Sequence, residues 1–169
     1  IFKDFNMQVN PKDKIAFVGK NDVAKTVFFD IIMGEMEPDS GTIEWGQTIT
    51  SSYFPKENSE FFNTYLPITD WLRQYSKDSD ESYIRGFLGR MLFSGEDALK
   101  PVNVLSGGEK VRCMLSKMMM EGANVLVADE PTNHLDLESI SALNDGLEKY
   151  DQVLLFSSMK MFIGLFRES

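Results

Sequence analysis

Residues 105–136 read LSGGEKVRCMLSKMMMEGANVLVADEPTNHLD, and this stretch decides the fold. It contains three features in order: Ser-Gly-Gly at residues 106–108 opening a helix, an apolar strand at 125–128 that ends in two carboxylates, and a turn at 131–136. Each feature is weak alone, because Ser-Gly-Gly is usually a plain loop or cap, and an Asp-Glu pair after a strand usually lies in a solvated turn. Their joint occurrence at this spacing predicts a nucleotide site on an α/β protein.

The residue types in this stretch suit a phosphorylated ligand. A helix that starts after Ser106 exposes free N–H groups and a partial positive charge, which attract phosphate. Gly107 and Gly108 let the backbone approach a ligand, because they carry no Cβ atom. Asp129 ends a buried strand at the sheet edge where ligands of open α/β sheets bind, and it suits Mg²⁺, directly or through water. Glu130, the next residue, is placed to polarise an attacking water molecule.

A second phosphate-binding segment lies upstream. Residues 14–18 read KIAFV and predict a short strand, and apolar residues predict a helix at 27–33. In the loop between them, backbone N–H groups would wrap the phosphates, Lys25 would reach the β- and γ-oxygens, and Thr26 would hold Mg²⁺. The loop consists of Gly19, Lys20, Asn21, Asp22, Val23, Ala24, Lys25 and Thr26.

This loop departs from the usual phosphate-loop pattern at two places. Ala24 stands directly before the lysine, where glycine is usual, and its methyl group is tolerated only at a negative φ. Asp22 brings a negative charge near the phosphates, which is unfavourable unless the side chain turns away or caps a helix. The loop is therefore recognisable but degenerate.

The chain resembles a nucleotide-binding domain of the ABC superfamily and, more narrowly, the ABC-F subfamily, whose members are soluble proteins with two cassettes in one polypeptide. The narrower resemblance rests on DEPTNHLD at residues 129–136 and LSGGEK at 105–110, supported by EPDSGTIEWG at 37–46 and by residues 84–109. It extends to about Ser158 and is greatest for a second, C-terminal cassette.

The resemblance implies an α/β fold with a RecA-like P-loop core, an antiparallel β subdomain and a helical subdomain, truncated at both ends. The core and β subdomain would comprise residues 1–64 and 116–169, and the helical subdomain residues 65–115. It also implies ATP and Mg²⁺ as ligands, a second cassette as partner, and the ribosome as partner of the full-length protein.

The resemblance further assigns roles in a sandwich of two cassettes. Lys25 and Glu130 would be catalytic, and Thr26 and Asp129 would hold the metal. The ATP of one cassette would be covered by the other cassette's residues Ser106, Gly107, Gly108 and Glu109. His134 and Asp136 would couple the two sites across the interface, and positioning is favoured over proton transfer for His134.

Further departures from the family bear on activity. Lys56 stands where cassettes usually carry a Gln that contacts Mg²⁺ and water, and a solvated turn residue is favoured over a lysine that pairs with a phosphate. Met159 falls at the usual switch histidine, and methionine cannot donate a hydrogen bond to the γ-phosphate. After Ser158 the resemblance stops, as expected from a frameshift, a truncated gene or a fragment boundary. The adenine-stacking aromatic is expected outside the chain.

Composition sets wider bounds. The 169 residues are enough for one domain with a real core, and the single cysteine, Cys113, indicates a reducing, cytoplasmic location without an internal disulfide. No run approaches the ~20 apolar residues of a membrane span. The net charge of −9 opposes nonspecific RNA binding by the whole domain. Lys110 and Arg112 are expected to add local positive charge near the phosphates.

Hydrophobic periodicity predicts the remaining elements. Alternation indicates an edge strand at 1–9, and β-forming residues indicate strands at 42–45 and 48–54, which together suggest a mixed sheet. Methionines after LSGGE are expected to fill the core. Helices are expected at 67–74, 79–93, 111–120 and 137–150, with a last strand at 152–157.

Three functions fit this sequence. The first is an ATP-hydrolysing ABC-F cassette acting on the ribosome. The second is a non-hydrolysing nucleotide-binding module, which Asp22, Ala24, Lys56 and Met159 favour. The third is the ATPase subunit of a membrane transporter.

Overall fold

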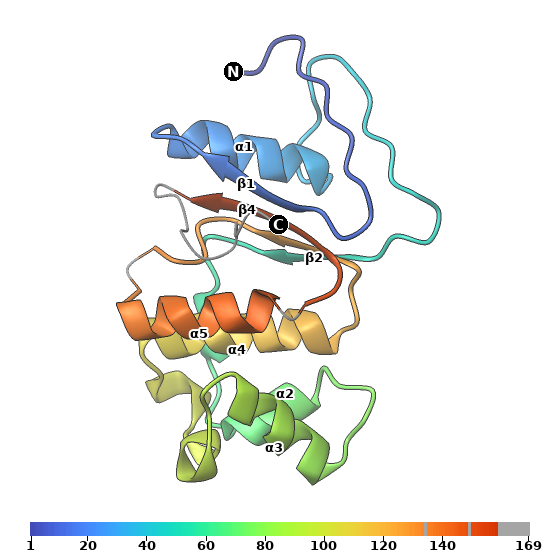
Figure 1. The fold of residues 1–169 in the computed structure, drawn as a ribbon. Helices are drawn as coiled ribbons and strands as arrows, with labels where there is room; N and C mark the ends of the chain where they lie inside the picture. The colour runs from blue at the N-terminus through green and yellow to red at the C-terminus, as the bar shows by residue number, and fades with distance from the viewer. Residues whose placement is uncertain (134, 149, 159–169) are drawn as a thin grey trace.

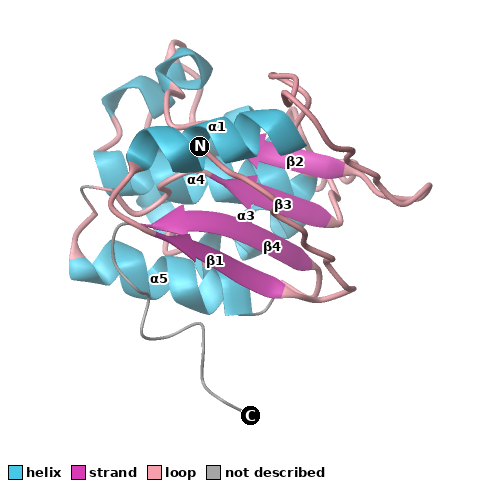
Figure 2. Cartoon of the chain, turned by 90° about the horizontal axis from the view of Figure 1, so that it is seen from above, coloured by secondary structure: helices cyan, strands magenta, loops and turns pink. Residues whose placement is uncertain are grey.

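The computed structural model describes residues 1–133, 135–148 and 150–158. Its centre is a four-stranded sheet with the order β1-β4-β3-β2, and every pair of neighbouring strands is parallel (Figures 1 and 2). The strands are β1 (Lys14–Val18), β2 (Ser51–Phe54), β3 (Val125–Ala128) and β4 (Val153–Ser158). Because the strands run in one direction, the residues that follow them gather at one edge of the sheet.

Helices cover both faces of this sheet. On one face lies α1 (Asp22–Ile32), and on the other lie α4 (Gly107–Met120) and α5 (Leu137–Glu148), as Figure 1 shows. Beyond α4 and α5 lie α2 (Ile68–Arg73) and α3 (Glu81–Arg90). Short 3₁₀ turns complete the chain at Ser59–Phe62, Gly95–Leu99 and Val102–Val104.

The strands sort their side chains between two cores. Val125 and Val127 of β3 pack with Phe28 and Phe29 of α1, whereas Leu126 packs in the larger cluster on the other face. This alternation follows from the two-residue period of a strand. Because both faces of the sheet are covered, β3 is buried along its whole length, as expected for a strand in a parallel sheet.

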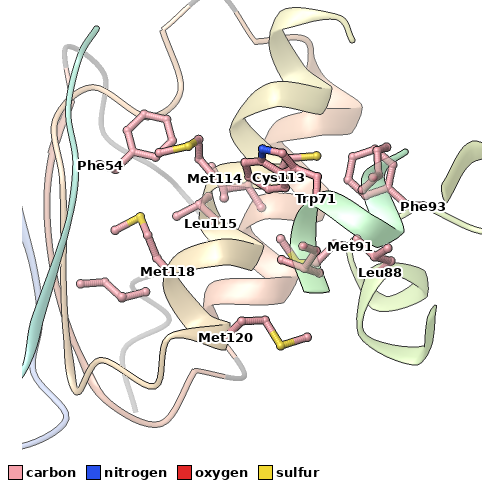
Figure 3. Close-up of a cluster of buried hydrophobic side chains, with 14 of the residues drawn as sticks. Phe54, Trp71, Leu88, Met91, Phe93, Cys113, Met114, Leu115, Met118 and Met120 are labelled. Atoms are coloured by element: carbon pink, nitrogen blue, oxygen red, sulfur yellow. The ribbon is translucent and has the colours of Figure 1, made fainter. Parts of the chain in front are cut away.

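The larger core joins the sheet to the helices of residues 68–120. Figure 3 shows Trp71, Met114 and Met118 within this core, and all three are at most 1% exposed. The prediction that methionines fill this core is confirmed. Cys113 is fully buried there, and burial raises the pKa of its thiol, so it remains protonated and has a packing role.

The predicted edge strand at residues 1–9 is wrong. These residues adopt no strand, and the rings of Phe2 and Phe5 lie against Phe28 of α1, with centroid separations of 5.5 and 5.4 Å. Alternating apolar residues therefore cover an aromatic helix face here. The pattern reports which side chains are apolar, and it does not show that a neighbouring strand is available for pairing.

The predicted mixed sheet is also absent from the described residues. Residues 42–45 form no strand, and of the strand expected at 48–54 only Ser51–Phe54 forms. Trp45 instead donates its indole N–H to the carbonyl of Ile32, 3.2 Å away, at the end of α1. The described residues therefore form no antiparallel β subdomain, and the sheet of their α/β core is parallel throughout.

The helical predictions hold with shifted ends. Two expected helices correspond to α2 and α3, and Asp80 caps α3 by accepting from the Tyr83 N–H at 3.1 Å. The last helix ends at Glu148, with residue 149 outside the described part, and the last strand is shifted by one residue. In the part of the chain that the structure describes, none of the helices combines the length and apolarity of a membrane span.

Candidate functional site

The upstream phosphate loop is shorter than predicted, because α1 begins inside it. The helix starts at Asp22 and not at residue 27, and Asn21 caps it by accepting the Ala24 N–H at 3.0 Å through its side chain. The Lys25 N–H bonds the Asn21 carbonyl at 3.2 Å. Two residues explain the earlier start: Asp22 places a negative charge in the first turn, and Ala24 favours helix more than glycine does.

Lys25 is the centre of the site's charges. Its side chain is 8% exposed, and its Nζ donates to the Gly19 carbonyl at 2.9 Å. It also forms a buried ion pair and hydrogen bond with Glu130 and lies 3.1 Å from Oδ1 of Asp22. Burial alone would lower the pKa of the Lys25 ammonium, but these two carboxylates outweigh it and raise the pKa. The lysine therefore stays charged and engaged.

Thr26 and Asp129 meet directly. The Thr26 hydroxyl donates to Oδ2 of Asp129 at 2.6 Å, and the Asp129 side chain is buried at the end of β3. Hydroxyl and carboxylate oxygens are ligands that Mg²⁺ accepts, and it usually keeps several waters beside them. In the described part of the chain, no group of three or more His, Cys, Asp or Glu side chains is arranged to hold a metal ion by itself. These two oxygens therefore fit an ion completed by water and phosphate.

Ser157 is a site residue that the sequence reading missed. Its hydroxyl donates to Oδ1 of Asp129 at 2.6 Å and accepts the Glu130 N–H at 2.8 Å. The contact follows from the register of β3 and β4, which pairs Ala128 with Phe156 and so sets Ser157 beside Asp129. The signal available in the sequence was a serine directly after the apolar run at 153–156, because polar residues at the carboxyl end of such a strand lie at the ligand-binding edge of the sheet.

Glu130 adopts a strained backbone. Its φ is 50°, a left-handed conformation that is uncommon for a residue with a side chain. The Ser157 hydroxyl and the Lys25 ammonium hold the two ends of this residue, its N–H and its carboxylate. Such strain concentrates at functional positions, and it costs roughly 1–3 kcal/mol.

One edge of the sheet thus brings together four residues that were predicted from two distant segments: Lys25, Thr26, Asp129 and Glu130.

The segment after residue 104 is organised differently. Ser106 accepts the Glu109 N–H at 3.2 Å, and Glu109 accepts the Ser106 N–H at 3.4 Å, which forms a capping box at the start of α4. α4 thus begins directly after Ser106, as the Ser-Gly-Gly pattern predicts, and four residues before the start at 111 that hydrophobic periodicity predicts. Glu109 also lies 3.6 Å from the ammonium of Lys100. The contacts of this segment are therefore local and do not involve Lys25.

The two glycines of this segment have different surroundings. A Cβ atom on Gly108 would lie 2.3 Å from the Ser139 hydroxyl oxygen, so this glycine lets α4 approach α5. A Cβ atom on Gly107 would have no neighbour within 4 Å. Gly108 is thus explained by packing within the chain, and Gly107 leaves open space beside the helix start.

Lys110 and Arg112 point toward the helical part of the chain. The Lys110 ammonium lies 5.8 Å from the Phe62 ring centroid, and the Arg112 guanidinium lies 4.7 Å from that of Phe93. Arg112 also donates to the Met91 carbonyl at 3.1 Å. The expectation that these cations add positive charge near the phosphates stays a prediction; within this chain their long side chains cover apolar rings.

Asp136 acts as a cap in this structure. Its Oδ1 accepts the Ser139 N–H at 2.7 Å at the start of α5, and this hydrogen bond lowers the pKa of the Asp136 carboxyl. The role of Asp136 in coupling two cassettes stays a prediction. His134 and Met159 lie outside the described residues.

Lys56 lies near the start of α1. Its Nζ is 4.0 Å from Oδ2 of Asp22. The two side chains border an open pocket of about 210 Å³ that also touches Val23, Thr26 and Val27. Lys56, which stands at the position of the usual glutamine, therefore lies beside the first turn of α1.

The fold and these contacts define a phosphate-loop nucleotide-binding protein, with a lysine and threonine opening a helix beside a buried Asp-Glu pair. Residues 2–133 match the family described as ABC transporter, and the chain belongs to this family as an ATP-binding cassette.

Individual relatives agree with this assignment. YkpA of Bacillus subtilis strain 168, described as an uncharacterized ABC transporter ATP-binding protein, is 63% identical over 89% of this chain and 28% of its own length. YbiT of Escherichia coli O157:H7, described as a probable ATP-binding protein, is 41% identical over 94% of this chain and 30% of its own length. The chain thus spans about three-tenths of these relatives.

Among solved structures, the chain is similar to one in the complex of the archaeal ribosomal stalk protein aP1 and the archaeal ribosome recycling factor aABCE1. The TM-score is 0.68 at 26% identity, covering 88% of this chain and 29% of that chain.

Proposed function

We propose that this chain is an ATP-hydrolysing cassette of the ABC-F type that works within a ribosome-associated protein. The observation that carries the hydrolytic part is the convergence of Lys25, Thr26, Asp129 and Glu130 at one sheet edge, linked by direct contacts. These are the groups that phosphoryl transfer to water requires: a phosphate-binding cation, two metal ligands and a carboxylate beside them.

Each residue has a definable task. Lys25 binds the β- and γ-phosphate oxygens, and the first turn of α1 adds its partial positive charge. Thr26 and Asp129 hold Mg²⁺, which when bound neutralises charge on the phosphates. Glu130, released from Lys25 by the incoming phosphates, orients the attacking water. Catalysis then rests on positioning and electrostatics, with Ser157 keeping Asp129 and Glu130 in register.

A second cassette completes the site in this proposal. The capping box keeps Ser106 and Glu109 at the exposed start of α4, and Gly107 leaves space for a ligand to approach the backbone. Residues 106–109 would therefore cover the ATP of the partner cassette, with His134 and Asp136 at the interface. Within the chain, we assign residues 65–115 to the helical subdomain and residues 1–64 and 116–169 to the core.

The ribosome enters through similarity and sequence pattern. DEPTNHLD and LSGGEK resemble ABC-F cassettes, and the aABCE1 chain belongs to a ribosome recycling factor. The net charge of −9 disfavours a broad contact of this domain with RNA. Contacts with the ribosome would be local or supplied by other parts of the full-length protein.

A non-hydrolysing nucleotide-binding module is the alternative that the geometry also favours. The helix start at Asp22 occupies the Ala24 and Lys25 N–H groups, and Lys25 already has partners in Asp22 and Glu130. ATP must displace these contacts before it binds productively. Phosphate release separates the two functions, because only the hydrolysing cassette turns ATP over.

Ribosome co-sedimentation of the full-length protein tests the proposed partner. With ATP, the Glu130→Gln variant should be trapped in the ATP-bound state and sediment with ribosomes. A matched Lys25→Ala, Glu130→Gln double variant, which lacks the phosphate-binding lysine, should remain in the supernatant. The ribosome assignment fails if the Glu130→Gln variant binds ATP and still stays in the supernatant.

A further inference from the structure

Two departures from the usual cassette pattern meet in this structure. Asp22 stands at a position where the phosphate loop usually has glycine, and Lys56 stands where the segment after β2 usually has glutamine. Oδ2 of Asp22 and Nζ of Lys56 lie 4.0 Å apart. Two changes that each alter the charge at the phosphates therefore compensate one another across the site.

The Asp22 carboxylate lies between two lysines. Its Oδ1 is shielded from solvent and forms an ion pair with Nζ of Lys25, 3.1 Å away. Its Oδ2 faces Lys56. Two oxygens of a phosphate group are able to pair with two ammonium groups in the same way as this carboxylate does.

Lys56 shares a pocket with Thr26, one of the two proposed metal-binding residues. The open pocket of about 210 Å³ is lined by both Lys56 and Thr26, and Thr26 contacts Asp129. The Asp129 N–H also bonds the Phe54 carbonyl at 3.1 Å, which fixes the chain two residues before Lys56 beside the metal ligands. The Lys56 side chain is 47% exposed, so its flexible stem is free to follow a ligand.

The ion pairs of the site join two lysines, Lys25 and Lys56, to two carboxylates, Asp22 and Glu130. These four charges balance without a ligand, and the Asp129 carboxylate adds to the negative side. A triphosphate carries more negative charge than one carboxylate and presents it in a bidentate form. It therefore competes with Asp22 for both lysines.

We propose that Lys56 is a second phosphate-binding lysine of this cassette, and that Asp22 is the carboxylate that a nucleotide phosphate replaces between Lys25 and Lys56. This inference rests on the proposed ATP binding and adds a residue that responds to the terminal phosphate. The displaced Asp22 turns to solvent at the exposed start of α1, where a negative charge remains favourable.

The competing interpretation is a surface ion pair that only screens Asp22. In that case removing Lys56 weakens nucleotide binding solely because Asp22 then repels the phosphates. The Asp22→Asn background separates the two interpretations, because it removes the repulsion and keeps the side-chain shape. A direct contact between Lys56 and phosphate still loses affinity in that background.

The experiment measures equilibrium binding of MgATP and MgADP to the full chain and to Lys56→Met, Asp22→Asn and the double variant. We expect Asp22→Asn to tighten MgATP binding. Adding Lys56→Met to Asp22→Asn should weaken MgATP binding by about tenfold and MgADP binding by less, since one charged contact is lost. The matched controls are Lys12→Met and Asp151→Asn. These two exposed residues form an ion pair with a distance of 3.0 Å, Lys12 just before β1 and Asp151 just before β4, and neither substitution should change the affinity for MgATP or MgADP.

The outcomes distinguish this inference from the proposed function. If Lys56→Met changes nothing in the Asp22→Asn background while Lys25→Ala abolishes MgATP binding, the cassette binds ATP and the proposal for Lys56 is wrong. Equal losses for MgATP and MgADP would also overturn it, because the contact would not be to the terminal phosphate. If the unaltered chain binds no nucleotide, the proposed function itself fails.

Discussion

The two segments assigned to nucleotide binding are held in place by different forces. Residues 19–26 depend on charge, because Lys25 is surrounded by Asp22 and Glu130 in a buried cluster. Residues 106–109 depend on backbone shape, through a capping box and the close approach of α4 to α5. The difference predicts that substitutions in the first segment act mainly on ligand affinity, and substitutions in the second act mainly on folding stability.

The strongest test of this difference is Lys25→Ala. It removes the phosphate-binding cation and leaves the Glu130 carboxylate buried without its partner. Loss of the charged contact between this lysine and the phosphates costs roughly 2–5 kcal/mol of binding free energy, which corresponds to at least about thirtyfold in MgATP affinity. Equilibrium binding measurements give the MgATP affinity of the Lys25→Ala variant and of the unaltered chain. An affinity within about threefold of the unaltered chain would contradict the role of Lys25.

Gly108→Ala tests the second segment. The new methyl group would clash with the Ser139 side chain, so we expect a loss of about 1–3 kcal/mol in the free energy of unfolding, as for other overpacked sites. Gly107→Ala is the matched control, because its Cβ meets no neighbour and alanine favours helix. Urea denaturation compares the two. Equal stability of both variants would show that α4 and α5 do not meet as described.

The capping box gives a smaller effect in the same segment. Ser106→Ala removes the side chain that accepts the Glu109 N–H and should cost about 1 kcal/mol in the free energy of unfolding. Ser106→Asp keeps an N-cap acceptor and should restore most of that loss. Thermal unfolding of both variants checks this. A Ser106→Ala variant as stable as the unaltered chain would argue against the box.

The smallest effect is expected from Ala24→Gly in the first segment. Glycine weakens the first turn of α1, so the free energy of unfolding should fall by roughly 0.5–1 kcal/mol. The same change frees the backbone to leave the helix and wrap phosphate, so MgATP affinity should rise. Binding and denaturation on one sample show both effects. A loss of affinity would mean that the helical loop is already the binding conformation.

The sequence predicted those features that depend on local pattern and chemistry. The apolar runs identified β1 and β3, and the residue types after them identified Lys25, Thr26, Asp129 and Glu130. The structure confirms that these four side chains are neighbours. Polar residues directly after a strand indicate a site, because the carboxyl ends of parallel strands lie together at one edge of the sheet.

Features that depend on which segments become neighbours were harder to predict. Ser157 reaches Asp129 only through the pairing of β3 with β4, and Gly108 is constrained only by Ser139 on another helix. The strand predicted at residues 1–9 is wrong for the same reason, because its aromatic side chains pack against α1 and the segment does not pair with a strand. Local alternation specifies which face is buried, and tertiary contacts decide what buries it.

The helix start at Asp22 is an intermediate case. A loop was expected because the phosphate-loop pattern continues to Thr26, yet Asn21, Asp22 and Ala24 together form a good helix N-terminus. Capping and propensity were visible in the sequence, and they prevailed over the motif. A helix therefore begins inside a phosphate-loop motif when the motif contains residues that cap and favour a helix.

The most direct test of the central claim measures phosphate release from ATP by the full-length protein, with MgATP binding followed on the same samples. The account predicts that the unaltered protein releases phosphate. The Glu130→Gln variant should keep its MgATP affinity and lose about tenfold or more of the rate, because the carboxylate that orients water is gone. Absence of phosphate release from the unaltered protein, or an undiminished rate in Glu130→Gln, would contradict the assignment of this chain as an ATP-hydrolysing cassette.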